Sequence, residues 1–117
     1  MAPVRQAVRR AGAVLREIVL SRRASAVDAN QASIVAALRA VGASVQLLHK
    51  VGGGCPDLLV GHRGTNHILE VKDGSLPPSG RRLNARQMKW HGEWRGHVVV
   101  VESVEDALAA IKVGRGA

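Results

Sequence analysis

Large aromatic side chains and cysteines are nearly absent from this sequence. Tyrosine and phenylalanine do not occur, two tryptophans are present, and Cys55 is the single cysteine. With so few aromatic rings, the chain cannot bind a ligand mainly by aromatic stacking. One cysteine excludes an intramolecular disulfide, and no cysteine and histidine spacing is typical of a zinc site. No run of about 18 apolar residues occurs, so the sequence predicts neither a transmembrane helix nor a membrane partner.

Acidic residues are also scarce. Nine Asp and Glu residues stand against 17 Lys and Arg residues, which gives a formal net charge of +8. Thirteen of the basic residues are arginines, which suit bidentate phosphate contacts, although a GC-rich genome also enriches arginine. In a folded domain of this size the charge predicts a nucleic-acid partner, DNA above all. Between residues 29 and 92 the only acids are Asp57, Glu70 and Asp73.

Two of these acids flank a pattern typical of a β-hairpin. Two short apolar runs, joined by a polar turn that contains glycine, separate Asp57 from Glu70. If the runs pair as antiparallel strands with Val60 opposite His67, Asp57 comes opposite Glu70. Side chains two apart on a strand share a face, so Lys72 projects beside Glu70. The pattern therefore predicts two carboxylates and one ammonium at one end of a sheet.

That combination suits a metal-dependent phosphodiesterase. A hard cation such as Mg²⁺ is held by one or two carboxylates with water and substrate phosphate. The cation lowers the pKa of a bound water and neutralises charge on the phosphate. Lys72 would add positive charge where the attacking hydroxide and the pentavalent phosphate carry negative charge. We therefore expect Mg²⁺ as the cofactor, with Mn²⁺ as a substitute, held by Asp57 and Glu70.

The same residues carry a family resemblance. The run Gly53 to Gly61, followed by residues 68–72, resembles the active-site signature of PD-(D/E)XK nucleases. Within these enzymes it is most similar to the small VRR-NUC and Holliday-junction-resolvase-like group, and the similarity covers residues 28–112. The resemblance implies an α/β fold with a mixed central β-sheet flanked by helices, the restriction-endonuclease-like core.

The resemblance also implies roles for individual residues. Asp57 and Glu70 would be metal ligands together with the carbonyl group of Val71, and Lys72 would be the catalytic lysine. In relatives, a glutamine equivalent to Gln87 tends to point towards the site. Gln87 has a second explanation, because it stands at the position of a capping-box partner for a helix that starts after residue 84. Both roles stay open.

One position departs from the family pattern. Many relatives carry a glutamate on the helix before the first strand, where it contacts the metal directly or through water. The corresponding place here falls at Gln31, with Asn30 and Asp28 close by. An amide can accept a hydrogen bond from a metal-bound water but brings no charge, so Gln31 is a weak auxiliary candidate. Asp28 is better explained as the N-cap of the helix that follows.

Periodicity predicts two regions and eight elements. Residues 1–27 read as a basic N-terminal helix and linker, and residues 28–117 as the nuclease-like domain. We expect the central strands to be buried on both faces, and Trp90 and Trp94 to belong to the core. The expected elements are helices over 4–20 and 28–41, strands over 44–49, 58–60 and 67–72, a helix after Asn84, a strand over 97–101 and a helix after Ser103.

Phosphate contacts are expected from basic residues around the proposed site. The loop after Asp73 is rich in turn-forming residues and ends in two arginines, which is typical of a substrate-contacting element, although a plain solvated connection explains it equally well. The candidate phosphate-binding residues are Lys50, Arg63, Arg81, Arg82 and Lys89.

These features predict a metal-dependent endonuclease that acts on structured or branched DNA. The alternative is a basic DNA-binding module that retains the fold without turnover. The apolar stripe of the N-terminal helix (Val4, Val8, Leu15 and Ile18) suggests a homodimer contact or a DNA-gripping arm. Closed two-fold dimers present two equivalent sites, as the resolution of a junction requires. We expect a cytoplasmic protein of a prokaryote or phage; an arginine-rich organellar transit peptide is the alternative reading of the N-terminus.

Overall fold

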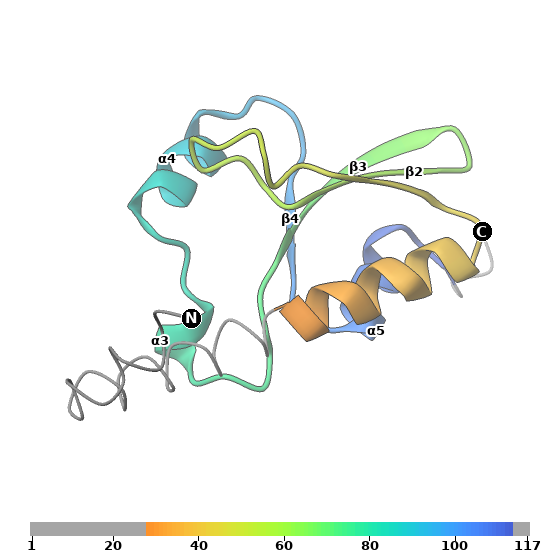
Figure 1. Ribbon diagram of the computed structural model, residues 1–117. Coiled ribbons are helices and arrows are strands. Elements are labelled where there is room, and N and C mark those ends of the chain that lie inside the picture. Colours follow the sequence, from red (N-terminus) through yellow and green to blue (C-terminus); the bar gives the residue numbers. More distant parts are fainter. Residues whose placement is uncertain (1–27, 114–117) are drawn as a thin grey trace, which may run out of the picture.

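A four-stranded mixed sheet forms the centre of residues 28–113, the part of the chain that the structure, a computed structural model, describes (Figure 1). Residues 28–40 are helical and precede the first strand. Within this part of the chain, no helix is long and apolar enough to cross a membrane. The remaining elements are β1 (Ser44–Leu47), β2 (Leu58–His62), β3 (Thr65–Val71), α3 (Pro78–Arg81), α4 (Ala85–Glu93), β4 (Val99–Val101) and α5 (Val104–Ala110).

The pairing of β2 with β3 confirms the predicted register. The strands are antiparallel, Val60 lies opposite His67, and Leu58 lies opposite Leu69. Arg63 and Gly64 form the two-residue turn between the strands with φ of 51° and 79°. A hairpin loop of two residues favours positive φ at both positions, because this backbone twist matches the twist of the strands. The local turn therefore supports the register that brings the two acids together.

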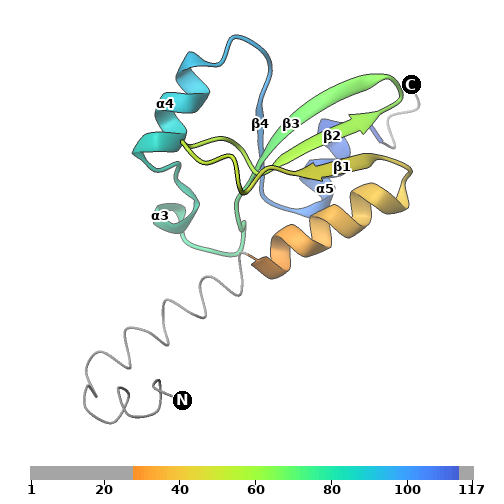
Figure 2. The same cartoon turned by 45° about the horizontal axis from the view of Figure 1, so that its top comes forward.

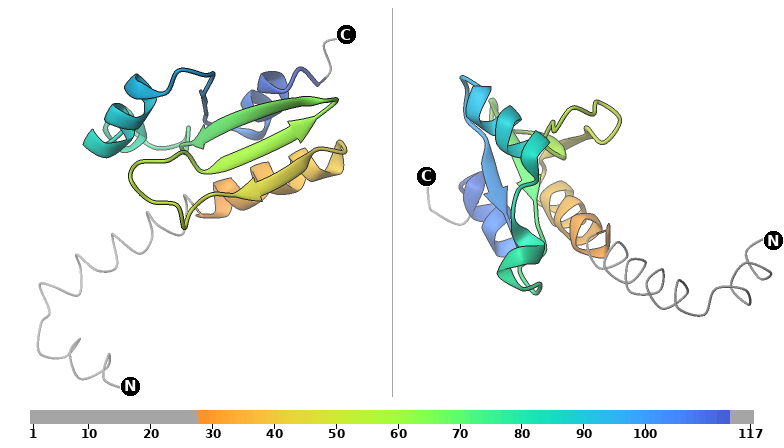
Figure 3. Two further views of the ribbon diagram at one scale, coloured as in Figure 1. Left: turned by 90° about the horizontal axis from the view of Figure 1, so that it is seen from above. Right: turned by 90° about the vertical axis from the view of Figure 1, so that its left-hand side faces the viewer.

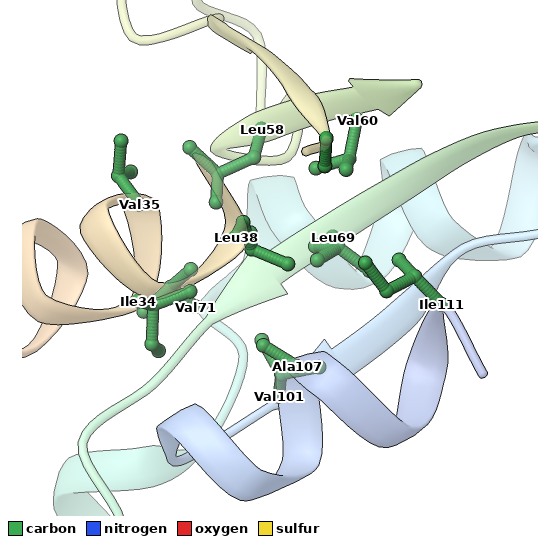
Figure 4. Packing of buried hydrophobic residues seen from close by; sticks show 11 residues of the cluster. Ile34, Val35, Leu38, Leu58, Val60, Leu69, Val71, Val101, Ala107 and Ile111 are labelled. Atoms are coloured by element: carbon green, nitrogen blue, oxygen red, sulfur yellow. The ribbon is translucent and has the colours of Figure 1, made fainter. Parts of the chain in front are cut away.

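One face of the sheet carries the core. Side chains alternate along the strands, so Leu58, Leu69 and Val101 point to the same side and are fully buried. The helix of residues 28–40 and α5 cover this face, as Figures 1 and 4 show. The helices contribute Ile34, Val35, Leu38, Ala107 and Ile111. Each large apolar side chain buried in this way stabilises the fold by about 1.5–3 kcal/mol.

The other face of the sheet is largely open, so the prediction that the strands are buried on both faces is wrong. Leu59 is 38% exposed and Val100 is 42% exposed. Figure 3 (left) looks onto this face, with the helix of residues 28–40 and α5 behind the strands. Only the end of the face near Glu70 is covered, because α4 contacts that side chain. A uniformly apolar strand does not reveal which of its faces is covered.

The helix ends agree with the predicted caps in two of three cases. The Asn84 side chain accepts a hydrogen bond from the Gln87 backbone N–H, and a full capping box is present at the start of α4. The Ser103 side chain accepts a hydrogen bond from the Asp106 backbone N–H at the start of α5. Asp28, by contrast, is itself helical, so the N-cap predicted at this position is not observed.

Three further expectations about elements differ from the structure or lie outside it. Helix α4 contains no buried residue; Trp90 is half-buried and Trp94 is 45% exposed, so their assignment to the core is wrong. The loop after Asp73 contains a short helix, α3, which the sequence did not predict. The expected helix over residues 4–20 and its apolar stripe lie outside the described residues.

Candidate active site

Asp57 and Glu70 meet where β2 begins and β3 ends. Leu58 lies opposite Leu69, so the next residue pair along the hairpin is Asp57 and Glu70. The Asp57 carboxylate Oδ2 accepts a hydrogen bond of 2.7 Å from the backbone N–H of Val71. This bond joins the residue before β2 to the last residue of β3, and it fixes the orientation of the Asp57 side chain. Rigid strands rather than a loop therefore position both acids.

The carbonyl group of Val71 points to the same side as Asp57. The Lys72 backbone N–H donates to the Val101 carbonyl at 2.9 Å, on the side of β4. The hydrogen-bonding groups of successive residues point to opposite edges of a strand, so those of Val71 point towards β2. The Val71 N–H contacts Asp57 there. Two carboxylates and one carbonyl thus share one end of the hairpin.

Glu70 is a buried acid with polar partners on every side. Its side chain is 1% exposed. The pKa of Glu70 is raised to about 8, mainly because the side chain is buried. A hydrogen bond to the Asp57 carboxyl and the negative charge of Asp57 raise this pKa further, whereas the Lys72 ammonium lowers it. In the absence of a cation, a proton on the Glu70 carboxyl removes the repulsion between the two acids. A bound cation would replace this proton.

Gln87 completes the capping box of α4 and also points towards the candidate site. Its side-chain Oε1 accepts hydrogen bonds from the Asn84 backbone N–H and from Lys72 Nζ, each 2.9 Å long. Its Nε2 lies 3.5 Å from Glu70 Oε2. The amide that completes the capping box of α4 therefore also holds the lysine and approaches the carboxylate. The two roles are compatible because an amide oxygen has two lone pairs.

His91 belongs to the site and was missed by the sequence analysis. Its Nε2 lies 3.1 Å from Glu70 Oε1, and its side chain is 13% exposed. Burial and the nearby Lys72 ammonium lower the pKa of His91. The signal in the sequence was its spacing, because residues four apart on a helix share a face and His91 follows Gln87 by four. Two successive turns of α4 thus face the same carboxylate.

The glycine run before Cys55 allows the 48–57 connection to lie against α4. Gly54 has φ of +84°, and a side chain there would collide with the backbone carbonyl of Arg86 in the first turn of α4. A run of glycines allows either a close backbone approach or a plain flexible loop. At Gly54, the close approach is to a helix. This contact sets the position of α4, and with it that of Gln87, relative to Asp57.

Of the polar residues on the helix of residues 28–40, Asn30 contacts the end of the sheet. Its Nδ2 donates to the carbonyl of Lys72 at 2.8 Å and approaches the carbonyl of Glu102 at 3.4 Å. Asn30 therefore joins the residues that follow β3 and β4. Gln31, which the sequence placed where relatives carry the helix glutamate, lines a surface groove with Val35 and Leu47. Within residues 28–113 it makes no hydrogen bond to either acid.

The basic candidates are divided between the two ends of the sheet. Figure 2 shows the 48–57 connection, α3 and α4 at one end and the turn between β2 and β3 at the other. Lys50, Arg82 and Lys89 are exposed and lie on the elements of the first end. Arg81 lies there too, with its Nη1 3.1 Å from Glu102 Oε2. Arg63 occupies the hairpin turn at the opposite end, away from Asp57 and Glu70.

The donor groups suit a hard cation better than a soft one. Within residues 28–113, no group of three or more His, Cys, Asp and Glu side chains is arranged to hold a metal. The Asp57 and Glu70 carboxylates and the Val71 carbonyl form an all-oxygen set, which fits Mg²⁺ with water completing its shell. Cys55 is nearby, and burial and the two acids raise the pKa of its thiol. A protonated thiol is a poor ligand and nucleophile.

Comparisons with protein-family models, with curated proteins and with solved structures find no match. The resemblance to PD-(D/E)XK nucleases rests on residues 53–61 and 68–72 and stays a prediction. A functional conclusion for this chain therefore depends on the chemistry of the groups that its own fold brings together.

Proposed function

We propose that this protein is a metal-dependent nuclease that hydrolyses phosphodiester bonds in nucleic acid. One observation carries the proposal: Asp57 and Glu70 come next to each other in the hairpin, one pair beyond Leu58 and Leu69, and the Glu70 side chain is 1% exposed there. Burying Glu70 beside another acid is costly, and a divalent cation between the two would offset that cost. The Lys72 ammonium, held by Gln87 at 2.9 Å, supplies the positive charge that such a reaction needs next to the metal.

Each residue has a separate task in this reaction. When bound, Mg²⁺ lowers the pKa of a water molecule and neutralises charge on the phosphate. Asp57, oriented by the Val71 N–H, and Glu70 hold the cation with the Val71 carbonyl. Lys72 stabilises the negative charge that develops on the phosphate in the transition state. Gln87 and His91, which share one face of α4, fix the Glu70 carboxylate in place.

The charge of the surface supports DNA as the substrate. Lys50, Arg82 and Lys89 are exposed at the same end of the sheet as the two acids, where they can contact phosphates on either side of the cut. The net charge of +8 gives the sequence-independent affinity that such an enzyme uses. We infer structured or branched DNA as the substrate class, and Mg²⁺ or Mn²⁺ as the metal.

A cleavage panel tests the nuclease proposal. Wild-type protein is incubated with duplex, single-stranded, flap and four-way-junction DNA, with Mg²⁺, with Mn²⁺ or with EDTA. We expect EDTA to abolish cleavage by the wild type. The variants Asp57→Asn and Glu70→Gln should also lose cleavage, while they still bind DNA. Glu105→Gln, at an exposed acid on α5, which covers the opposite face of the sheet, is the matched control and should cleave normally. Binding without cleavage by the wild type would establish the non-catalytic DNA-binding module instead.

We also propose that the protein acts as a homodimer. One domain offers one site and cuts one strand, whereas a junction needs two symmetric cuts, which a two-fold dimer provides. The apolar stripe of Val4, Val8, Leu15 and Ile18 in the sequence is the proposed contact. Analytical ultracentrifugation at micromolar concentration should give a dimer. A monomer that cuts both strands of a junction symmetrically would contradict this assembly.

A further inference from the structure

The two tryptophans of the chain form a stacked pair at the C-terminal end of α4, with Trp94 at the C-cap. The rings of Trp90 and Trp94 have centroids 4.5 Å apart and planes inclined by 16°. Trp94 is 45% exposed. A large aromatic side chain that stays exposed beside a candidate active site is a binding feature more often than a packing one. No residue of α4 is buried, so the pair contributes little to the core.

The geometry of the pair leaves one flat aromatic surface available. Trp90 covers one face of the Trp94 indole. The backbone of Gly96 lies beside the nitrogen of the ring, since a side chain added there would come within 2.9 Å of Trp94 Nε1. With one face stacked and the Nε1 edge contacted, we assign the exposed area of Trp94 mainly to its opposite face.

The surroundings of the pair are strongly basic. Arg82, Arg86, Lys89 and Arg95 are all exposed on or next to α4, and Glu93 is the only acid between residues 81 and 97. Proteins that bind single-stranded nucleic acid combine aromatic rings for the bases with cations for the backbone phosphates. A surface that binds a second protein usually carries charges of both signs, whereas this one carries cations and a single acid. Charge and shape together therefore favour a nucleotide.

The pair is also close to the reacting groups. Trp90 contacts His91 edge-to-face, with ring centroids 5.8 Å apart, and His91 Nε2 lies 3.1 Å from Glu70 Oε1. Two ring contacts thus connect Trp94 with the carboxylate that would hold the metal. A nucleotide bound with its phosphate at Glu70 would have a neighbouring base within reach of Trp94.

We propose that the outer face of Trp94 stacks on an unpaired nucleobase next to the phosphate that is cut. This inference rests on the proposed nuclease function and narrows its substrate. A base can reach the indole only when it is not paired, so the preferred substrates contain single-stranded nucleotides at the cut, as flaps, forks and single strands do. Uninterrupted duplex would bind through its phosphates alone.

Fluorescence can test the proposal without any cleavage. Both tryptophans lie in the pair, so the intrinsic tryptophan emission reports on this surface alone. The Trp90→Phe variant leaves Trp94 as the single emitter. In EDTA, we expect a short oligothymidylate to quench its emission, and a blunt duplex without unpaired bases to quench it far less. Trp94→Ala should weaken oligothymidylate binding, measured by anisotropy, by about tenfold, whereas duplex affinity stays unchanged.

Two further variants provide the controls. Trp94→Phe keeps a smaller aromatic ring and should recover part of the lost affinity, which a merely structural role would not require. Met88→Ala removes another exposed apolar side chain of α4, 61% exposed, and should bind like the wild type.

Several results would overturn the proposal. Absence of quenching by oligothymidylate would do so, as would equal losses for single strand and duplex in Trp94→Ala. Conversion of a dimer to a monomer by Trp94→Ala would show that a second copy of the chain covers this surface instead. These binding results do not depend on catalysis. Quenching by a protein that shows no metal-dependent cleavage would support the proposed stacking by Trp94 and contradict the proposed nuclease function. Cleavage without quenching would do the reverse.

Discussion

Gln87 Oε1 accepts a hydrogen bond from Lys72 Nζ at 2.9 Å, and this contact couples a helix cap to the candidate catalytic lysine. The same oxygen accepts the backbone N–H of Asn84. The first turn of α4 and the residue after β3 are therefore held by one side chain. Any change that displaces the start of α4 should also change where the Lys72 ammonium lies.

Removal of Gln87 should reduce both stability and turnover. Gln87→Ala deletes half of the capping box and the acceptor for Lys72. Loss of a cap typically costs about 1 kcal/mol, and a misplaced ammonium should slow cleavage further. Asn84→Ala is the matched control, because it removes the other half of the box and leaves the Lys72 partner in place. Chemical denaturation and single-turnover cleavage should show similar destabilisation in both variants and slow cleavage in Gln87→Ala alone.

Lys72 should act on the transition state rather than on metal affinity. Lys72→Ala removes the positive charge next to the phosphate, and loss of one such contact costs about a hundredfold or more in rate. Titration of the cleavage rate with Mg²⁺ should give a similar midpoint for variant and wild type at very different maximal rates. Lys112→Ala, at an exposed lysine after α5, should cleave normally. Near wild-type rates for Lys72→Ala would show that the assigned role is wrong.

Gly54 should be intolerant of any side chain. Gly54→Ala places a Cβ against the Arg86 carbonyl and at a positive φ, so we expect a loss of about 2 kcal/mol or more in the free energy of unfolding. Cleavage should fall because α4 carries Gln87 and His91. Gly92→Ala provides the same substitution on α4 in open space and should be neutral or stabilising, since alanine favours helix. Equal melting temperatures for the two variants would contradict the proposed contact of the 48–57 connection with α4.

The metal-free protein should lose stability as the pH rises through neutrality. The pKa of Glu70 is raised from 4.5 to about 8 in the folded protein. Between these values the folded state binds more protons than the unfolded chain, so the free energy of unfolding falls with rising pH. In EDTA we expect a loss of about 1 kcal/mol between pH 7 and pH 8.

The variant Glu70→Gln isolates this effect. Its side chain at position 70 cannot ionise, so urea unfolding of this variant should give nearly equal free energies of unfolding at pH 7 and pH 8. Burial lowers the pKa of both His67 and His91, away from this range. A wild-type protein whose stability does not change between these two pH values would show that Glu70 is already ionised at pH 7.

Local features explain why part of the fold could be predicted from the sequence. Alternation of side chains and the two-residue turn of Arg63 and Gly64 set the register of β2 and β3, and the spacing of Asn84 and Gln87 set the cap of α4. These relationships involve residues close together in the chain. The same register brought Asp57 and Glu70 together, so the centre of the candidate site was predictable as well.

Contacts between distant segments were decided only by the tertiary structure. His91 and Glu70 are 21 residues apart, and Asn30 and Lys72 are 42 residues apart; no local pattern links either pair. Gly54 required glycine because α4 packs against it, and Leu59 stayed exposed because the helix of residues 28–40 and α5 lie on the opposite face. The sequence by itself determined the register of β2 with β3 and the caps of α4 and α5, because short-range geometry governs them. Which face was covered, and which side chains surround Glu70, depended on long-range packing of the helices.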